Sequence, residues 1–96
     1  MRIISQDRTI DVPYDNVVVY VHNQSNQIYV KMYVSGIDYN REGFSIGKYH
    51  NKEDAICVMS HMRDKFPYAT YYHMPLADDV DLIRDNLDYA GSKDGM

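Results

Sequence analysis

Alternating apolar and polar side chains through residues 27–34 place the strongest constraint on the fold. The apolar set is Ile28, Val30, Met32 and Val34, and the intervening set is Tyr29, Lys31 and Tyr33. A period of two is typical of an antiparallel strand that has one buried and one solvated face. The valine-rich segment Val17–His22 precedes this strand across the polar residues 23–26, so we predict a β-hairpin.

Shorter β-prone segments surround this hairpin. Arg2–Ser5 and Thr9–Val12 lie on either side of the polar residues 6–8 and indicate a second hairpin. Pro13 is predicted to end it, because proline lacks the N–H that a central strand needs. The other predicted segments are a loop at Ser35–Gly43 and strands at Phe44–Tyr49 and Ala69–Met74.

Two helices are predicted in the second half of the chain. Asn51 is a good N-cap for the first helix, which is expected to run to about Phe66 and to end before Pro67. Its apolar stripe consists of Ala55, Val58, Met59, Met62 and Phe66, so it should pack on a sheet. A second amphipathic helix is predicted from about Ala77 to Tyr89, with the apolar residues Leu76, Val80, Ile83 and Leu87.

These elements together predict an α+β fold. We expect an antiparallel β-sheet of about four to six strands, with one long helix packed on one face and a short C-terminal helix. The chain has 96 residues, which fits one domain over residues 1–90, followed by a flexible C-terminal tail at residues 91–96.

The charge balance narrows the choice of partners. Ten Lys and Arg residues stand against 14 Asp and Glu residues, which gives a formal net charge of −4. Duplex nucleic acid and anionic membranes are bound largely through cationic side chains, so both are disfavoured as partners. The chain shows no apolar stretch typical of a signal peptide or a membrane span, and we expect a cytoplasmic location.

One cluster on the first predicted helix has the residue types of a catalytic site. Cys57, His61 and Asp64 are spaced so that a thiol, an imidazole and a carboxylate share one side of the helix. That side lies opposite the apolar stripe and is predicted to face solvent, so we predict no catalytic residues and no enzyme. The single cysteine also excludes an internal disulfide.

The histidines and glycines show no ligand-binding motif. His22, His50, His61 and His73 lack the spacing of metal ligands, and Gly36, Gly43 and Gly47 form no phosphate-binding loop. We therefore predict neither a metal nor a cofactor.

An excess of tyrosine is the first feature that points to a binding surface. The chain has ten tyrosines but two phenylalanines and no tryptophan. If the valines of the long hairpin face the helix, its other face carries Tyr20, His22, Tyr29, Lys31 and Tyr33, which we call the tyrosine face. Tyr71 or Tyr72 could extend it, depending on how the strands pair. Such a face can bind a protein, pack in a homodimer or stack a base, although β-propensity and cross-strand ring packing would also explain it.

A row of carboxylates on the second predicted helix is another candidate surface. Asp78, Asp81, Asp85 and Asp88 lie opposite its apolar residues and form an acidic stripe. Carboxylates in a row can imitate the phosphates of nucleic acid, and they are also common on an ordinary solvated helix face.

Two parts of the chain have a recognisable pattern: Met1–Asp7 followed by Ile10–Tyr14, and Gly47–Ala55, which leads into a methionine-containing helix. In these segments the chain resembles a group of short hypothetical proteins of Gram-positive bacteria and their phages. The resemblance does not extend past Tyr72 and includes no catalytic signature. It implies a mobile-element or accessory protein that acts by binding.

We therefore predict a non-catalytic accessory protein of phage or prophage type. It would bind a protein partner, including a second copy of itself, through the tyrosine face. One alternative is an inhibitor of a host nucleic-acid-handling defence system, of the anti-restriction or anti-CRISPR type, that uses the acidic stripe. Another is a module that binds small ligands or single-stranded nucleic acid by stacking on the same tyrosines.

Overall fold

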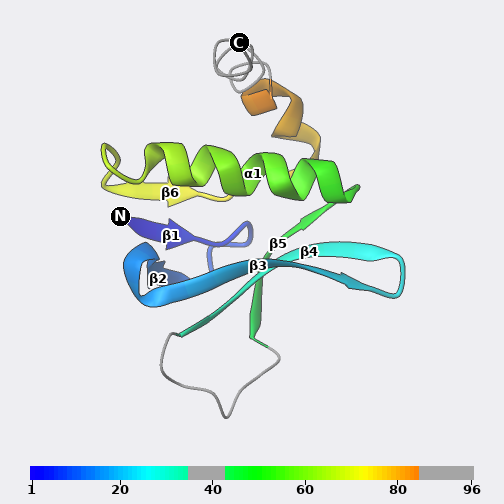
Figure 1. The fold of residues 1–96 in the computed structure, drawn as a ribbon, viewed down its shortest axis with the longest axis horizontal. Helices are drawn as coiled ribbons and strands as arrows, with labels where there is room; N and C mark the ends of the chain where they lie inside the picture. Colours follow the sequence, from blue (N-terminus) through cyan, green and yellow to red (C-terminus); the bar gives the residue numbers. More distant parts are fainter. Residues whose placement is uncertain (35–42, 85–96) are drawn as a thin grey trace, which may run out of the picture.

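The computed structural model describes residues 1–34 and 43–84 of the chain, and these form an α+β fold, as predicted (Figure 1). They contain six strands, one long helix, two short 3₁₀ segments and a short α-helical stretch at residues 80–84. In chain order these are β1 (Arg2–Ile4), β2 (Asp11–Pro13), η1 (Tyr14–Asn16), β3 (Val17–Gln24), β4 (Gln27–Val34), β5 (Phe44–Tyr49), α1 (Lys52–Lys65), β6 (Tyr71–His73) and η2 (Ala77–Asp79).

The described strands form two three-stranded sheets rather than the single sheet that we predicted. One sheet has the order β3-β4-β5 and is antiparallel throughout. The other has the order β2-β1-β6, in which β1 is antiparallel to β2 and parallel to β6. The parallel pair arises because α1 carries the chain back before β6 begins, so β6 runs in the same direction as β1 (Figure 1).

The long hairpin is confirmed, but its turn is shorter than predicted. Asn23 and Gln24, which we placed in a loop, pair with Ile28 and Gln27 and extend β3. Only Ser25 and Asn26 form the turn, with positive φ values of 53° and 63°. A two-residue turn with both residues in the left-handed region matches the twist of the paired strands, and asparagine tolerates that region better than most residues.

The short N-terminal hairpin is also confirmed. Ile3 of β1 lies opposite Val12 of β2, and the Ser5 amide donates a hydrogen bond to the Ile10 carbonyl at 2.9 Å. Pro13 is the last residue of β2 rather than a residue outside it. The position is compatible with proline because β2 is an edge strand.

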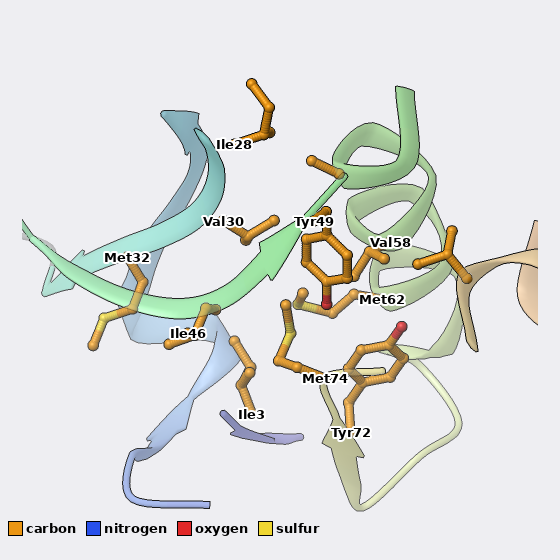
Figure 2. Close-up of a cluster of buried hydrophobic side chains, with 12 residues drawn as sticks. Ile3, Ile28, Val30, Met32, Ile46, Tyr49, Val58, Met62, Tyr72 and Met74 are labelled. Atoms are coloured by element: carbon orange, nitrogen blue, oxygen red, sulfur yellow. The ribbon is translucent and has the colours of Figure 1, made fainter. Parts of the chain in front are cut away.

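The core lies between α1 and the inner faces of both sheets. Asn51 caps the helix as predicted, because its side-chain oxygen accepts a hydrogen bond from the Asp54 amide at 2.8 Å. Val58 and Met62 of the helix point towards Tyr49 of β5 (Figure 2). The predicted apolar stripe is largely buried, although Phe66 stays 39% exposed and packs its ring on that of Tyr14.

The second predicted helix begins differently from our expectation. Residues 77–79 form the 3₁₀ segment η2, and residues 80–84 continue as α-helix. Val80 is buried in the core, whereas Leu76 precedes the helix and is 57% exposed. The end of this helix, the tail at residues 91–96 and most of the loop predicted at Ser35–Gly43 lie outside the described residues.

A single glutamine joins the two sheets at the free edge of β5. The Gln6 amide donates a hydrogen bond to the Ile46 carbonyl at 2.9 Å. The Gln6 side chain accepts from the Lys48 amide at 2.8 Å and donates to the carbonyls of Lys48 at 3.2 Å and Pro75 at 2.8 Å. Gln6 therefore satisfies the edge of β5 much as a short strand would.

Across residues 1–34 and 43–84, no helix is both long enough and apolar enough to span a membrane.

Candidate functional site

The tyrosine face exists as a continuous surface on the sheet β3-β4-β5. The register of the hairpin places Tyr20 opposite Lys31 and His22 opposite Tyr29. Val18 lies opposite Tyr33. Because directly paired residues project from the same side of a sheet, all five predicted residues share one face, and each is half-buried. Val30 and Met32 project from the opposite side of the sheet into the core, to which α1 also contributes.

Ring contacts organise the centre of this face around Tyr20. Its ring centroid lies 5.9 Å from that of Tyr33 in a tilted arrangement and 6.4 Å from that of His22 in an edge-on arrangement. Both distances are within the range at which aromatic pairs attract. The Tyr29 hydroxyl donates a hydrogen bond to the Gln27 side chain at 2.7 Å. The rings are therefore held by their neighbours, which limits the entropy lost when a partner binds.

The structure adds three residues that the sequence analysis missed. Val18 is 38% exposed on this face, Lys48 lies opposite Tyr29, and Ser45 lies opposite Lys31. A bulge between Val30 and Lys31 shifts the register of β5. Strict alternation within β5 would place Ser45 and Lys48 on opposite faces, but the bulge places both on the tyrosine face. Lys48 can be assigned to the tyrosine face only when the pairing of β4 with β5 is known.

Gly43 marks one end of the face and approaches Tyr20 closely. Its φ is +65°, in the region that favours glycine. A Cβ atom at this position would lie 2.8 Å from the Tyr20 hydroxyl and 2.7 Å from the Met32 carbonyl oxygen. A side chain here would push on Tyr20, so Gly43 is part of what positions that ring.

Neither Tyr71 nor Tyr72 extends the face, contrary to our expectation. Both belong to β6 in the other sheet. Tyr72 is 6% exposed and points into the core (Figure 2), whereas Tyr71 is 59% exposed and contacts His73 with a centroid distance of 5.2 Å. The error has a physical origin, because β6 pairs with β1 rather than with the long hairpin.

The two described residues of the acidic stripe make polar contacts, Asp78 with a histidine and Asp81 with an arginine. Asp78 lies 3.0 Å from Nε2 of His50, and Asp81 lies 3.2 Å from a guanidinium nitrogen of Arg84. Both carboxylates remain largely exposed, with side-chain exposures of 92% and 85%. Asp85 and Asp88 lie outside the described residues. The acidic stripe therefore stays a prediction.

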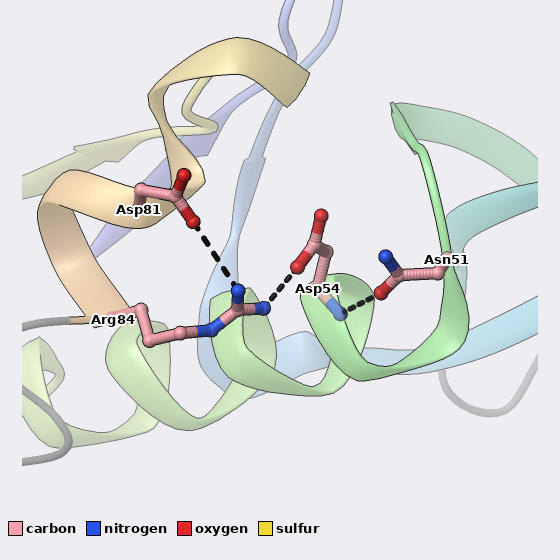
Figure 3. Close-up of polar contacts among 4 residues, drawn as sticks. All are labelled: Asn51, Asp54, Asp81 and Arg84. Atoms are coloured by element: carbon pink, nitrogen blue, oxygen red, sulfur yellow. Dashed lines mark hydrogen bonds and ion pairs between the residues drawn. The ribbon is translucent and has the colours of Figure 1, made fainter.

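Arg84 also contacts a second carboxylate, and this pairing is not predictable from local sequence patterns. Its guanidinium lies between Asp81 and Asp54, and Asp54 is only 7% exposed at the start of α1 (Figure 3). The hydrogen bond with Asp54 raises the pKa of Arg84. This ion pair links the helical residues 80–84 to the start of α1.

The cluster of Cys57, His61 and Asp64 differs from our prediction of a solvent-facing side. Cys57 is half-buried against the core, and Nδ1 of His61 lies 2.8 Å from the Tyr72 hydroxyl. Burial lowers the pKa of His61, and the neighbouring Lys65 adds to this effect. Only Asp64 is exposed. The prediction was wrong for two residues because β6 lies beside this part of α1 and brings Tyr72 against it.

The other pockets and polar clusters of the described residues give weaker support for a functional site. Over residues 1–34 and 43–84, no three His, Cys, Asp or Glu side chains converge in a way that could hold a metal ion. A groove of about 210 Å³ lies between β3 and α1, and its lining consists of Tyr14, Val17, Val19, Met59, Met62 and Arg63. This volume is below that of usual small-molecule sites.

Comparison with known protein families, with characterised proteins and with solved structures gives no match to this chain. The fold and the site define a small α+β protein with an aromatic face that also carries lysines. The resemblance to short phage and bacterial proteins stays a sequence prediction.

Proposed function

We propose that this chain is a small accessory protein of phage or prophage type that acts by non-catalytic binding of another protein through the tyrosine face. The observation that carries the proposal is the register of the hairpin, which gathers Tyr20, Tyr29 and Tyr33 on the side of the sheet that α1 leaves uncovered. The resemblance of the N-terminal segments supports the biological context.

The chemistry of this face suits a protein partner. Tyrosine offers a large apolar ring and a polar hydroxyl with few rotatable bonds, and it is enriched where interfaces concentrate their binding energy. Val18 adds exposed apolar surface beside Tyr20, while Lys31 and Lys48 supply charge. Aromatic residues with neighbouring charges are the usual composition of an interface centre and its rim.

The competing explanation is that the rings only stabilise the sheet. Cross-strand aromatic pairs contribute about 0.2–1 kcal/mol each, so the Tyr20–Tyr33 contact serves the fold in either case. Tyr29 distinguishes the two explanations, because its hydroxyl bonds only to a neighbour on its own strand among the contacts that the structure describes. A purely structural role predicts that removing Tyr29 and Tyr33 changes stability and nothing else.

The test uses matched pairs of tyrosine substitutions. The double variant Tyr29→Ser with Tyr33→Ser removes two rings from the tyrosine face. The control, Tyr68→Ser with Tyr71→Ser, removes two rings that are 87% and 59% exposed elsewhere. Proteins captured from host lysate by the immobilised chain are quantified by mass spectrometry, and circular dichroism verifies folding.

We expect at least one protein to be enriched by the unmodified chain and by the control, and to be lost with the tyrosine-face variant. Equal enrichment by all three chains would show that the tyrosine face is not the binding surface.

Single-stranded nucleic acid is a second candidate partner, and the position of Lys48 favours it. Lys31 and Lys48 both flank Tyr29 on the tyrosine face, so stacking rings and phosphate-binding charges lie side by side. The net charge of −4 opposes this candidate. A fluorescence titration with short oligonucleotides at low salt tests it. Saturable binding that weakens with added salt would support it, and a flat titration would dismiss it.

A further inference from the structure

Strand β3 forms an edge of its sheet without the usual protection against pairing with another chain. It has eight residues, and no other strand among the described residues pairs with its outer side. Its sequence, Val-Val-Val-Tyr-Val-His-Asn-Gln, contains no Lys, Arg, Asp, Glu or Pro. Its pairing with β4 is regular throughout. Edge strands usually carry charges, proline or bulges because exposed N–H and C=O groups otherwise recruit a further strand.

The other described sheet edges do carry such protection. The edge of β5 is covered by Gln6, and its ladder with β4 contains a bulge. The second sheet ends in β2 and β6, which have three residues each. In β2, one of the three is Pro13 and another is Asp11. Among the described edge strands, β3 alone combines a length of eight residues with the absence of charged residues and proline.

The hairpin register determines which backbone groups point to the open edge of β3. The two-residue turn places the hydrogen-bonded pair of the ladder at Gln24 and Gln27. Bonded and non-bonded pairs alternate along an antiparallel ladder. The N–H and C=O groups that face away from β4 therefore belong to alternate residues, which are Val17, Val19, Val21 and Asn23.

The same residues project their side chains towards the helix, where packing is incomplete. Val17, Val19 and Val21 are only half-buried, although they lie on the inner side of the sheet. The groove of about 210 Å³ runs beside the first two of them, with Met59 and Met62 of α1 on its other wall. An added strand would place its own inward side chains at this groove.

We propose that the open edge of β3 pairs with β3 of a second copy of this chain. The two strands run antiparallel about a two-fold axis and join the two sheets into one of six strands. Tyr20 lies opposite Tyr20 of the second copy, and Val19 lies opposite Val21. In this register every valine of β3 has a partner in the second copy. The outward-facing N–H and C=O groups of one β3 then lie opposite those of the other, so that they can form hydrogen bonds.

A second copy fits this edge better than a foreign peptide for two reasons. The strand is uncharged, so self-pairing opposes no like charges. The two-fold axis also places Val21 of each copy beside Val19 of the other, which lines the groove, so that each copy covers part of the groove of the other. A two-fold contact uses up the open edge of each copy and therefore yields a closed dimer rather than a fibre.

This inference goes beyond the proposed function, because it concerns the edge of the sheet and not its outer face. Pairing would set two tyrosine faces side by side and leave Tyr29 and Tyr33 open to another protein. Either idea can therefore fail without the other.

The register supplies a charge test on the outer face. Val18 lies opposite His22 of the second copy, and both residues are on the accessible side of the sheet. We compare two double variants, Val18→Lys with His22→Lys and Val18→Lys with His22→Glu. The first places like charges across the axis twice, and the second places opposite charges there twice. Both leave Tyr29 and Tyr33 in place.

Molar mass is measured by light scattering on the full chain over a range of concentrations, at low and high salt. The unmodified chain should have twice the monomer mass of 11.2 kDa, and salt should not change this. The like-charge variant should dimerise about tenfold or more weakly, and the opposite-charge variant should restore the dimer at low salt.

Val19→Pro is a complementary variant. It removes an N–H that points to the open edge and leaves the ladder with β4 intact, so it should give a folded monomer. If circular dichroism shows that Val19→Pro is unfolded, the two charge variants at Val18 and His22 still test whether the dimer forms through β3.

An unmodified chain that stays monomeric at all concentrations would overturn the inference. Equal masses for the two charge variants at low salt would also overturn it, as would an assembly larger than a dimer. A monomer that still captures a partner through the tyrosine face would leave the proposed function standing, whereas a dimer without such capture would remove the proposed function alone.

Discussion

Strands β3 and β5 form opposite edges of one sheet, and the molecule treats the two edges differently. The edge of β5 is occupied by Gln6, a residue of the turn between β1 and β2 that bonds to Ile46, Lys48 and Pro75. The edge of β3 has no such cover among the described residues. The difference shows that one side chain amide can close an edge that would otherwise need a strand. An edge closed in this way belongs to the fold, while an uncharged open edge is available for assembly.

The largest effect on stability is expected from a substitution that uncovers the edge of β5. Gln6→Ala removes three side-chain hydrogen bonds and leaves the Lys48 amide and carbonyl without their partner. We expect the free energy of unfolding to fall by about 2 to 3 kcal/mol, which urea denaturation followed by circular dichroism would measure.

Gln24→Ala is the matched control, because Gln24 is an exposed glutamine on the other edge strand. It should change the free energy of unfolding by less than about 0.5 kcal/mol. Equal losses from the two substitutions would mean that Gln6 does not close the edge of β5.

The second-largest effect is expected from acid, which should lower the stability of the turn that carries Gln6 by protonating the neighbouring Asp7. Hydrogen bonds from the side chain and amide of Thr9, and from the Ser5 hydroxyl, lower the pKa of Asp7 from 3.8 to about 2. A pKa lowered by folding stabilises the native state above the unfolded value, and this contribution is lost as pH falls through the folded value. Stability supplied by Asp7 should therefore decline between pH 4 and pH 2.

Asp7→Asn removes that carboxylate and provides the check. Urea midpoints measured for both chains from pH 5 to pH 2 should converge as the pH falls. A gap that stays constant through the window would mean that the carboxylate has no part in the acid sensitivity. Dimer formation at β3 involves no carboxylate, so the two edges should respond differently to acid.

The smallest expected effect concerns the turn that holds the open edge in place. Asn26 has a φ of 63°, which glycine adopts without steric cost. Asn26→Gly should stabilise the chain by about 0.5 kcal/mol, because Asn-Gly-type turns are favoured in two-residue hairpins and the strain at this position is relieved. The same substitution at Asn23, which lies in the β3–β4 ladder, should destabilise it. A loss of stability from Asn26→Gly would show that the turn is not of this type.

The sequence was informative wherever structure depends on neighbours along the chain. The alternation in residues 17–22 and 27–34 predicts which side chains share a face, and the register of the hairpin confirms that Tyr20, Tyr29 and Tyr33 lie together. The N-cap at Asn51 and the apolar stripe of α1 are local in the same sense.

Features that depend on distant pairing could not be derived in this way. Lys48 joins the tyrosine face only through a ladder that contains a bulge. Tyr72 leaves the predicted face because β6 pairs with β1, and Arg84 meets Asp54 across 30 positions of the chain. Periodicity within a segment contains no information about which segment lies beside it, so the division into two sheets was not predictable either.

The position of β1 in the centre of its sheet has a consequence for the order in which the molecule can assemble during synthesis. The ribosome makes β1 before most other elements, but its parallel neighbour β6 appears only at Tyr71–His73. Until then Ile3 lacks Tyr72 beside it, and the Gln6 side chain lacks the Pro75 carbonyl. Contacts between such distant segments slow folding, because a long loop must close before they form. The nascent chain can build the β1–β2 and β3–β4 hairpins early, whereas the side of β1 that pairs with β6 stays open until β6 has been translated.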